Sequence, residues 1–249
     1  MELFLALISG IFIGSVLGFV GAGGAMLSVP ILLYVFHYSP IHATTAALAI
    51  VFLAALSGVI PKYRKGEVLI RDAFLVWAFG LTTNLGTAIF AKHLPNTFIT
   101  SGFAVILVGA GISMLRAPAL NHGERKIPIL NLVLISLGIG CITGIFGVGG
   151  GFIMIPVLVL GFNISQAKAA GTSLLIIALN CLTSFIGHQS IWSQLHWHIP
   201  LIMAIAAVIT STFASHNSGR LPQKTLRKSF AYLLFSIALW TVLKTWFLG

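Results

Sequence analysis

Two glycine clusters inside apolar stretches could bind a ligand through their backbone alone. They hold Gly21, Ala22, Gly23, Gly24 and Ala25 in the first half of the sequence, and Gly147, Val148, Gly149, Gly150 and Gly151 in the second. Glycine is a poor helix former, so each cluster is expected to break a helix and to free backbone N–H and C=O groups. Without side chains in the way, these donors can approach a compact ligand closely.

Each cluster is followed by a short apolar segment, residues 25–36 and 151–162, that is expected to start a new helix. Segments of this length are too short for an untilted membrane crossing. The N-terminus of a helix presents unpaired N–H groups and about half a positive charge, which together favour an anion. The two breaks therefore predict a binding site for a small anion between the helix ends.

Hydroxyl and amide side chains in the following segments add neutral donors to this predicted site. They are Thr44 and Thr45 in "ATTAALAI", Thr172 and Ser173 in "AAGTSLLI", and Asn180. Such residues also let transmembrane helices pack closely, so packing is their alternative role, as a GxxxG-like face is for the glycines. Two successive breaks, each followed by a short helix, are more than packing needs, and they favour the binding role.

The amino-acid composition indicates that these elements fold in a lipid membrane. The chain of 249 residues is 58% hydrophobic and 7% charged, with a mean hydropathy of +1.05, which is typical of an all-α polytopic membrane protein. Apolar spans are expected at residues 3–20, 25–36, 43–61, 72–91, 97–115, 128–146, 152–162, 168–187, 197–215 and 229–248. The net charge of +10 is assigned to the loops between them, and this distribution argues against nucleic-acid binding.

The second half of the sequence repeats the first with an offset of 126 positions. The offset aligns Gly14, Gly21, Gly23, Gly24 and Pro30 with Gly140, Gly147, Gly149, Gly150 and Pro156. This shared order of glycines, proline, short helix and Ala-rich helix indicates an internal duplication. We assign residues 1–120 to the first repeat and 121–249 to the second, within one membrane domain.

The basic residues predict that the two repeats have inverted topology. Lys and Arg gather in three loops that are expected in the cytoplasm, residues 62–71, 116–126 and 220–228. The segment equivalent to the first loop, residues 187–198, has no Lys or Arg and carries two tryptophans, as an outer interfacial segment would. Equivalent loops on opposite sides require inverted repeats and place both termini outside. The glycine-broken unit then returns the chain to its side of entry, either by two crossings or as a hairpin that dips to the midplane.

Other chemistries lack the residues that they require. The four acids lie at the N-terminus or in expected loops, so a carboxylate cation site is disfavoured. Proton coupling would have to use histidine, and His37, His42, His188, His196 and His198 lie at helix ends, where an interfacial role is the simpler interpretation. Lys168 either attracts anions to a vestibule or snorkels to the interface.

Enzymatic and cofactor motifs are also missing from the sequence. It contains no nucleophile elbow, no HExxH and no GxxxxGK[ST] phosphate loop. Cys141 and Cys181 lack the spacing of a metal or redox pair and are most simply packing residues. We therefore expect no enzymatic activity, no cofactor and no metal.

The paired stretches "GFVGAGGAMLSVPILL" and "GIFGVGGGFIMIPVLVL", each followed by an Ala-rich segment, resemble the duplicated signature of the TauE/SafE family of membrane permeases. The resemblance covers nearly the whole chain. It implies a bacterial or archaeal inner-membrane transporter associated with sulfite, sulfoacetate or other sulfur-containing organic anions, often as an exporter. The first copy of the motif has Ala25 where the second has Gly151, which leaves open whether the two half-sites bind equally.

The leading hypothesis is a secondary transporter for a small anion, such as sulfite or another sulfur oxyanion or organosulfonate, that works by alternating access. An anion channel that uses the same helix ends as a selectivity constriction is the alternative. A non-transporting scaffold is a third hypothesis. The expected partners are the anionic substrate and the lipid bilayer, while the exact anion, the direction, the coupling ion and homo-oligomer formation stay open.

Overall fold

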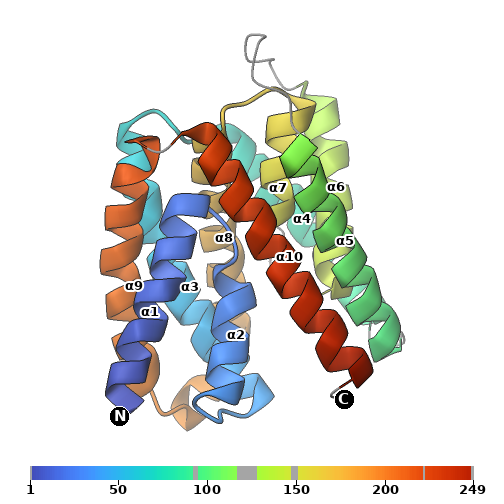
Figure 1. Cartoon of the computed structure of the whole chain (residues 1–249). Coiled ribbons are helices and arrows are strands. Elements are labelled where there is room, and N and C mark those ends of the chain that lie inside the picture. The colour runs from blue at the N-terminus through green and yellow to red at the C-terminus, as the bar shows by residue number, and fades with distance from the viewer. Residues whose placement is uncertain (1, 92–94, 117–127, 147–150, 221, 248–249) are drawn as a thin grey trace.

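A computed structural model describes residues 2–91, 95–116, 128–146, 151–220 and 222–247 of the chain (Figure 1). The described residues form one bundle of α-helices: α1 (Glu2–Val20), α2 (Gly24–Tyr34), α3 (Pro40–Arg64), α4 (Ile70–Ala91), α5 (Asn96–Arg116), α6 (Ile129–Phe146), α7 (Gly151–Pro156), α8 (Gln166–Gly187), α9 (His198–Asn217) and α10 (Gln223–Phe247). A π-helix, η1 (Val157–Gly161), continues α7, and two 3₁₀ turns, η2 (Gln189–Gln194) and η3 (Ser218–Arg220), flank α9. Every expected apolar span corresponds to helix, so the predicted all-helical architecture is confirmed.

The outer surface of the bundle is apolar, as a membrane requires. Within the described residues, α1, α3, α8, α9 and most of α10 are long and apolar enough to cross a bilayer. On α9, the exposed side chains of Leu201, Ile205, Ile209 and Phe213 follow one another every four residues and form an apolar stripe. Such a stripe on a helix surface is expected to face lipid.

The two short helices end in the same backbone geometry. The N–H of Tyr38 donates to the C=O of Leu32 at 3.0 Å, and the N–H of Ile164 donates to the C=O of Leu158 at 3.1 Å. The residue before each donor has a left-handed φ, 55° and 58°, so both short helices end in the same left-handed turn. The corresponding residues are 126 positions apart, the offset of the sequence duplication.

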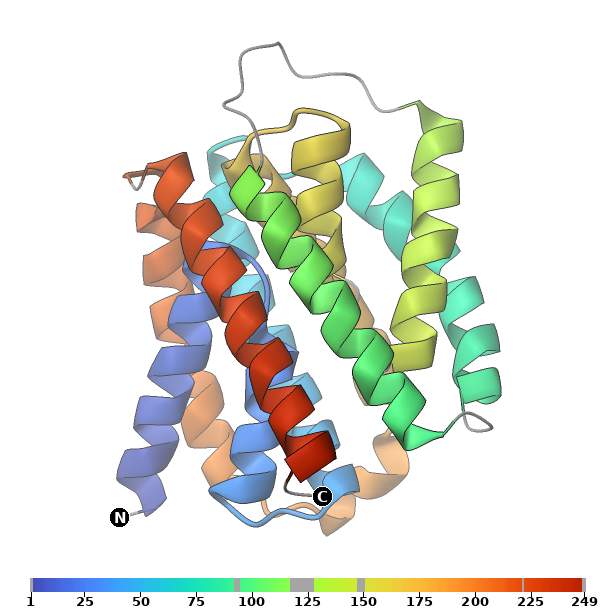
Figure 2. The same cartoon turned by 45° about the vertical axis from the view of Figure 1, so that its right-hand side comes forward.

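The first helix of each repeat packs against the fourth helix of the other. Gly14 of α1 lies so close to Ala207 of α9 that an added side-chain carbon would overlap its backbone. Gly140 of α6 lies in the same way against Gly80 of α4. Small residues therefore let these backbones approach closely, and the repeats interlock instead of forming separate bodies. The last helices of the repeats, α5 and α10, lie side by side (Figure 2).

The bundle has two ends, which we name by the segments found there (Figure 1). At the terminus end, α1 begins, α10 ends, and the turn at residues 36–39 lies near η2. At the strap end, α3 is joined to α4 by residues 65–69, which we call the strap, beside η3. The loop at 62–71 and its equivalent at 187–198 thus lie at opposite ends.

The first glycine-broken unit enters and leaves the bundle at the same end. Glu2 at the start of α1 and the turn that follows α2 line one cavity at the terminus end. α1 has 19 residues and α2 has 11, which correspond to lengths of about 28 Å and 16 Å. The unit is therefore one long helix followed by a half-length helix that starts inside the bundle.

Candidate functional site

The first glycine break is buried and depends on glycine at two positions. Gly21 and Gly23 have φ angles of 82° and 92°, in the left-handed region that strains any residue with a side chain. Gly21, Ala22, Gly23 and Gly24 are all buried. Glycine is therefore required here by backbone conformation, as the sequence predicted for a helix break.

The break leaves the N-terminus of α2 without a side-chain cap. Gly23 precedes the helix, and its C=O accepts the first helical bond from the N–H of Leu27 at 3.1 Å. No side chain among the described residues caps this N-terminus. The first N–H groups of a helix have no intrahelical acceptor, so the buried start of α2 presents donors and a positive dipole end inside the protein.

The break meets the second repeat at α8. Gly21 lies against Ala170 so closely that an added carbon would be 2.6 Å from the Ala170 Cα. Thr172 and Ser173 follow on the same helix and are fully buried. The hydroxyl oxygen of Thr172 accepts a 3.0 Å bond from the N–H of Leu69 in the strap. The first glycine cluster therefore lies near the hydroxyl residues of the opposite repeat.

The remaining predicted site residues lie elsewhere. Thr44 and Thr45, at the start of α3, bond to carbonyls of their own helix, and Thr45 Oγ1 is also 2.9 Å from His188 Nδ1 near the terminus end. The structure does not bring these threonines together with Thr172. Asn180 is partly buried along α8.

Much of the second glycine cluster cannot be placed beside the first. Gly147, Val148, Gly149 and Gly150 lie outside the described residues. Ala25 is within α2, and Gly151 begins α7. The anion site between the two breaks therefore stays a prediction.

Lys62 is a residue whose role the sequence interpretation missed. We assigned it to a solvated basic loop, but it lies in the last turns of α3 and is fully buried, so that assignment was wrong. Its Nζ donates to Ser218 Oγ at 2.8 Å and lies 3.7 Å from Glu67 Oε2. A helical signal was present, because Lys62 follows Ala54 and Gly58 at intervals of four residues on the small-residue face of the helix.

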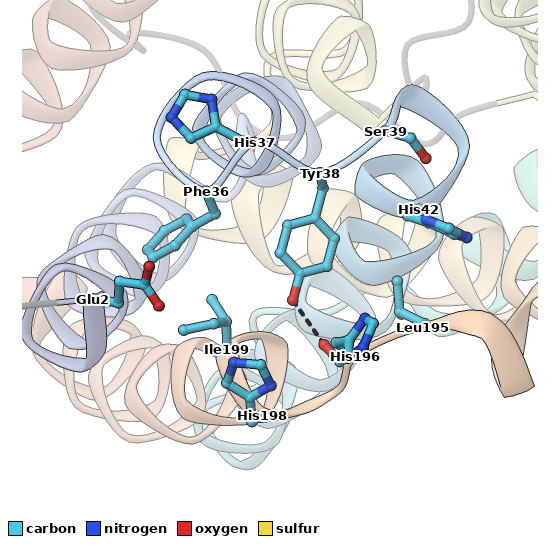
Figure 3. A pocket seen from close by; sticks show the side chains of 10 residues that line it. All are labelled: Glu2, Phe36, His37, Tyr38, Ser39, His42, Leu195, His196, His198 and Ile199. Atoms are coloured by element: carbon cyan, nitrogen blue, oxygen red, sulfur yellow. Dashed lines mark hydrogen bonds between the residues drawn. The ribbon is translucent and has the colours of Figure 1, made fainter.

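A cavity of about 330 Å³ opens at the terminus end, between the two repeats (Figure 3). It is lined by Glu2, Phe36, His37, Tyr38, Ser39, His42, Leu195, His196, His198 and Ile199. The hydroxyl of Tyr38 points across it and donates to the C=O of His196 at 2.7 Å. Burial, and then the charge of Glu2, raise the pKa of Tyr38 above its ordinary value. The structure thus gathers four of the histidines that the sequence placed at separate helix ends.

The comparison with known families decides the identity of this fold. The model of the family described as "Sulfite exporter TauE/SafE" matches residues 6–241. The chain belongs to this family. The membership confirms the resemblance carried by the paired glycine motifs, and it identifies the protein as a multi-pass membrane transporter.

Curated relatives of this TauE/SafE protein match it over nearly its full length. A protein of Xylella fastidiosa named "Probable membrane transporter protein" is 25% identical over 96% of this chain and 94% of its own. "Probable membrane transporter protein YdhB" of Bacillus subtilis is 26% identical over 91% and 94%. A protein of Methanocaldococcus jannaschii with a similar name is 24% identical over 96% and 95%.

Proposed function

We propose that this TauE/SafE protein is a secondary transporter for a small anion, which binds at the uncapped helix N-terminus beside Gly23. The observation that carries the proposal is the buried start of α2, whose backbone donors have no side-chain cap among the described residues. Backbone donors at a helix N-terminus favour negative ligands, and irregular backbone inside a membrane is tolerated where it is buried or lines a cavity. The family description favours sulfite, another sulfur oxyanion or an organosulfonate as the substrate.

We propose alternating access between inverted repeats as the mechanism. Three observations support it: the equivalent ends of α2 and η1, the equivalent glycine contacts of α1 and α6, and the location of equivalent loops at opposite ends. In inverted-repeat transporters, rocking of one repeat against the other exposes a fixed central site to each side in turn. The strap end is basic, so the positive-inside rule assigns it to the cytoplasm of a cell whose inner membrane holds the protein, with both termini outside.

Counterflow in proteoliposomes tests this proposal against the channel alternative. Vesicles preloaded with sulfite should accumulate labelled sulfite against its gradient, and the rate should saturate. Gly23→Val should abolish this counterflow, because valine is strained at a φ of 92° and its side chain would lie against Leu233. Gly138→Val is the matched control, since nothing lies within 4 Å of the position that its Cβ would take. Continuous conductance without counterflow would favour a channel. Normal counterflow by Gly23→Val would show that the first glycine break is not part of the anion-binding site.

A further inference from the structure

Lys62 combines complete burial with incomplete bonding. Its ammonium group carries three N–H donors, and the described contacts are one 2.8 Å hydrogen bond to Ser218 and a carboxylate oxygen of Glu67 at 3.7 Å. The second distance exceeds that of a hydrogen bond, which for this kind of pair is about 2.7–2.9 Å. Glu67 Oε2 is itself buried without a hydrogen-bond partner among the described residues. The cation therefore has a neighbouring anion that neutralises its charge but does not use its donors.

Such a pair is a costly way to stabilise a fold. Removing a lysine ammonium from water costs several kcal/mol, and apolar residues of similar volume often stabilise a protein as well as a buried ion pair does. Lys62 lies in the last turn of a helix that is long enough to span a membrane, where a lysine normally extends its side chain to solvent, yet it is fully buried. The position of Lys62 thus indicates a role in binding.

Lys62 is connected to the glycine break by a chain of hydrogen bonds. Ser218, its acceptor, donates to the C=O of Ser215 at 2.9 Å. Ser215 in turn donates to the C=O of Gly18 in the last turn of α1, at 3.3 Å. Gly18 is three residues before Gly21, where the break begins. These bonds join Lys62, through η3 and α9, to the last turn of α1, which leads into the first glycine break.

The strap that carries Glu67 closes over the same region. The C=O of Glu67 lies directly against Gly171 of α8, and the N–H of Leu69 donates to Thr172. Gly66 precedes Glu67 with a φ of 69°, and nothing lies within 4 Å of the position that its Cβ would take. The strap thus has a flexible residue next to its carboxylate and open space around that residue.

We propose that Lys62 is the cationic binding residue for the transported anion, and that the Glu67 carboxylate occupies its place while the strap is closed. This inference rests on the proposed function. A small oxyanion such as sulfite carries several acceptor oxygens and can use the ammonium donors that Glu67 does not reach. When the anion binds, Glu67 leaves with the strap toward solvent, and the contacts of the strap with Gly171 and Thr172 open. Release of the anion restores the Lys62–Glu67 pair.

The test is the concentration dependence of sulfite counterflow in proteoliposomes for the wild type and charge variants. Glu67→Gln removes the internal competitor and keeps Lys62, so we expect KM to fall about tenfold. Lys62→Met removes the cation, so KM should rise about tenfold or more. Lys224→Gln is the matched control: it removes one positive charge from an exposed side chain in the first turn of α10, outside the strap, and should change KM less than about twofold.

The double variant Lys62→Met/Glu67→Gln keeps the test valid if Lys62→Met fails to fold. It leaves no unpaired buried charge, so it is expected to fold. In this background the Glu67→Gln change should no longer lower KM, which gives the double variant a KM as high as that expected for Lys62→Met. A low KM in the double variant would overturn the role of Lys62.

The outcomes separate this inference from the proposed function. Saturable counterflow by the wild type, together with an unchanged or raised KM in Glu67→Gln, would overturn the competition between Glu67 and substrate and leave the transporter assignment standing. A purely structural ion pair predicts this result, with a lower melting temperature for Glu67→Gln. Absence of counterflow by the wild type for sulfite, sulfate and thiosulfate would overturn both proposals.

Discussion

The strap end and the terminus end of the bundle close the space between the repeats in different ways. At the strap end, a buried lysine, a carboxylate and a serine hydroxyl join α3, the strap and η3. At the terminus end, histidines and a tyrosine surround a cavity of about 330 Å³. The described residues therefore form a buried charged cluster at one end and a cavity at the other.

A membrane protein can in this way close one end with contacts that are able to open. An apolar seal would have to expose hydrophobic surface in order to open, at a cost proportional to the exposed area. A charged seal releases groups that water or an anion solvates well. The polar contacts of the strap end thus suit a surface that separates during the proposed transport cycle.

The largest expected effect is on the strap. Gly171→Val places a side chain where the Glu67 carbonyl now lies, and relief of this overlap costs about 1–3 kcal/mol. Hydrogen exchange at the strap amides, including Leu69, should accelerate about tenfold or more. Gly187→Val, at the terminus end of the same helix in open space, is the control and should leave the strap amides unchanged. Equal exchange in both variants would mean that Gly171 does not hold the strap.

A smaller effect is the difference in stability between the loss of one hydrogen bond at each end. Ser218→Ala removes the acceptor of a buried ammonium and should cost about 1.5–3 kcal/mol, whereas Tyr38→Phe removes a bond between neutral groups and should cost about 0.5–1.5 kcal/mol. The measurement is thermal unfolding in detergent. Equal losses in the two variants would contradict the contrast between the charged Lys62–Ser218 bond and the neutral Tyr38–His196 bond.

The smallest effect concerns the titration of Tyr38. Its pKa is raised first by burial and second by the Glu2 carboxylate, so Glu2→Gln should lower the pKa part of the way and leave it above the ordinary value. Because the folded-state pKa is raised, the associated stability is present below the ordinary pKa and is lost as the pH rises through the raised value. Ultraviolet difference titration against Tyr38→Phe measures the shift. An unchanged pKa of Tyr38 in Glu2→Gln would mean that the Glu2 carboxylate does not act on the Tyr38 hydroxyl.

The elements of this fold were predictable because membrane helices leave strong local signals. Each apolar span became helix, and the glycine clusters marked a break that the left-handed angles of Gly21 and Gly23 explain. Equivalent prolines behave differently, since Pro30 stays inside α2 whereas α7 ends at Pro156 and continues as a π-helix. A missing N–H can be accommodated in either way, and the choice depends on tertiary packing that a local pattern does not contain.

The candidate site was less predictable than the fold, because it depends on contacts between repeats. The sequence predicted one site that holds the hydroxyl residues of both halves, but Gly21 packs against α8 while Thr45 lies beside His188 near the terminus end. Lys62 carries the charge of a loop residue, and its burial follows from partners more than 150 positions away, such as Ser218. The four-residue spacing from Ala54 and Gly58 could indicate the buried face of the helix, but such a pattern does not identify the distant partner of Lys62.

The most direct test of the central claim is the thermal stability of the purified protein in a panel of anions: sulfite, thiosulfate, sulfate, sulfoacetate and chloride. A ligand that binds the folded state raises the melting temperature with its concentration. We expect a saturable rise with a sulfur oxyanion or sulfonate, and loss of this rise in Gly23→Val but not in Gly138→Val. A protein that no anion stabilises, or that responds to divalent metal cations alone, would contradict it.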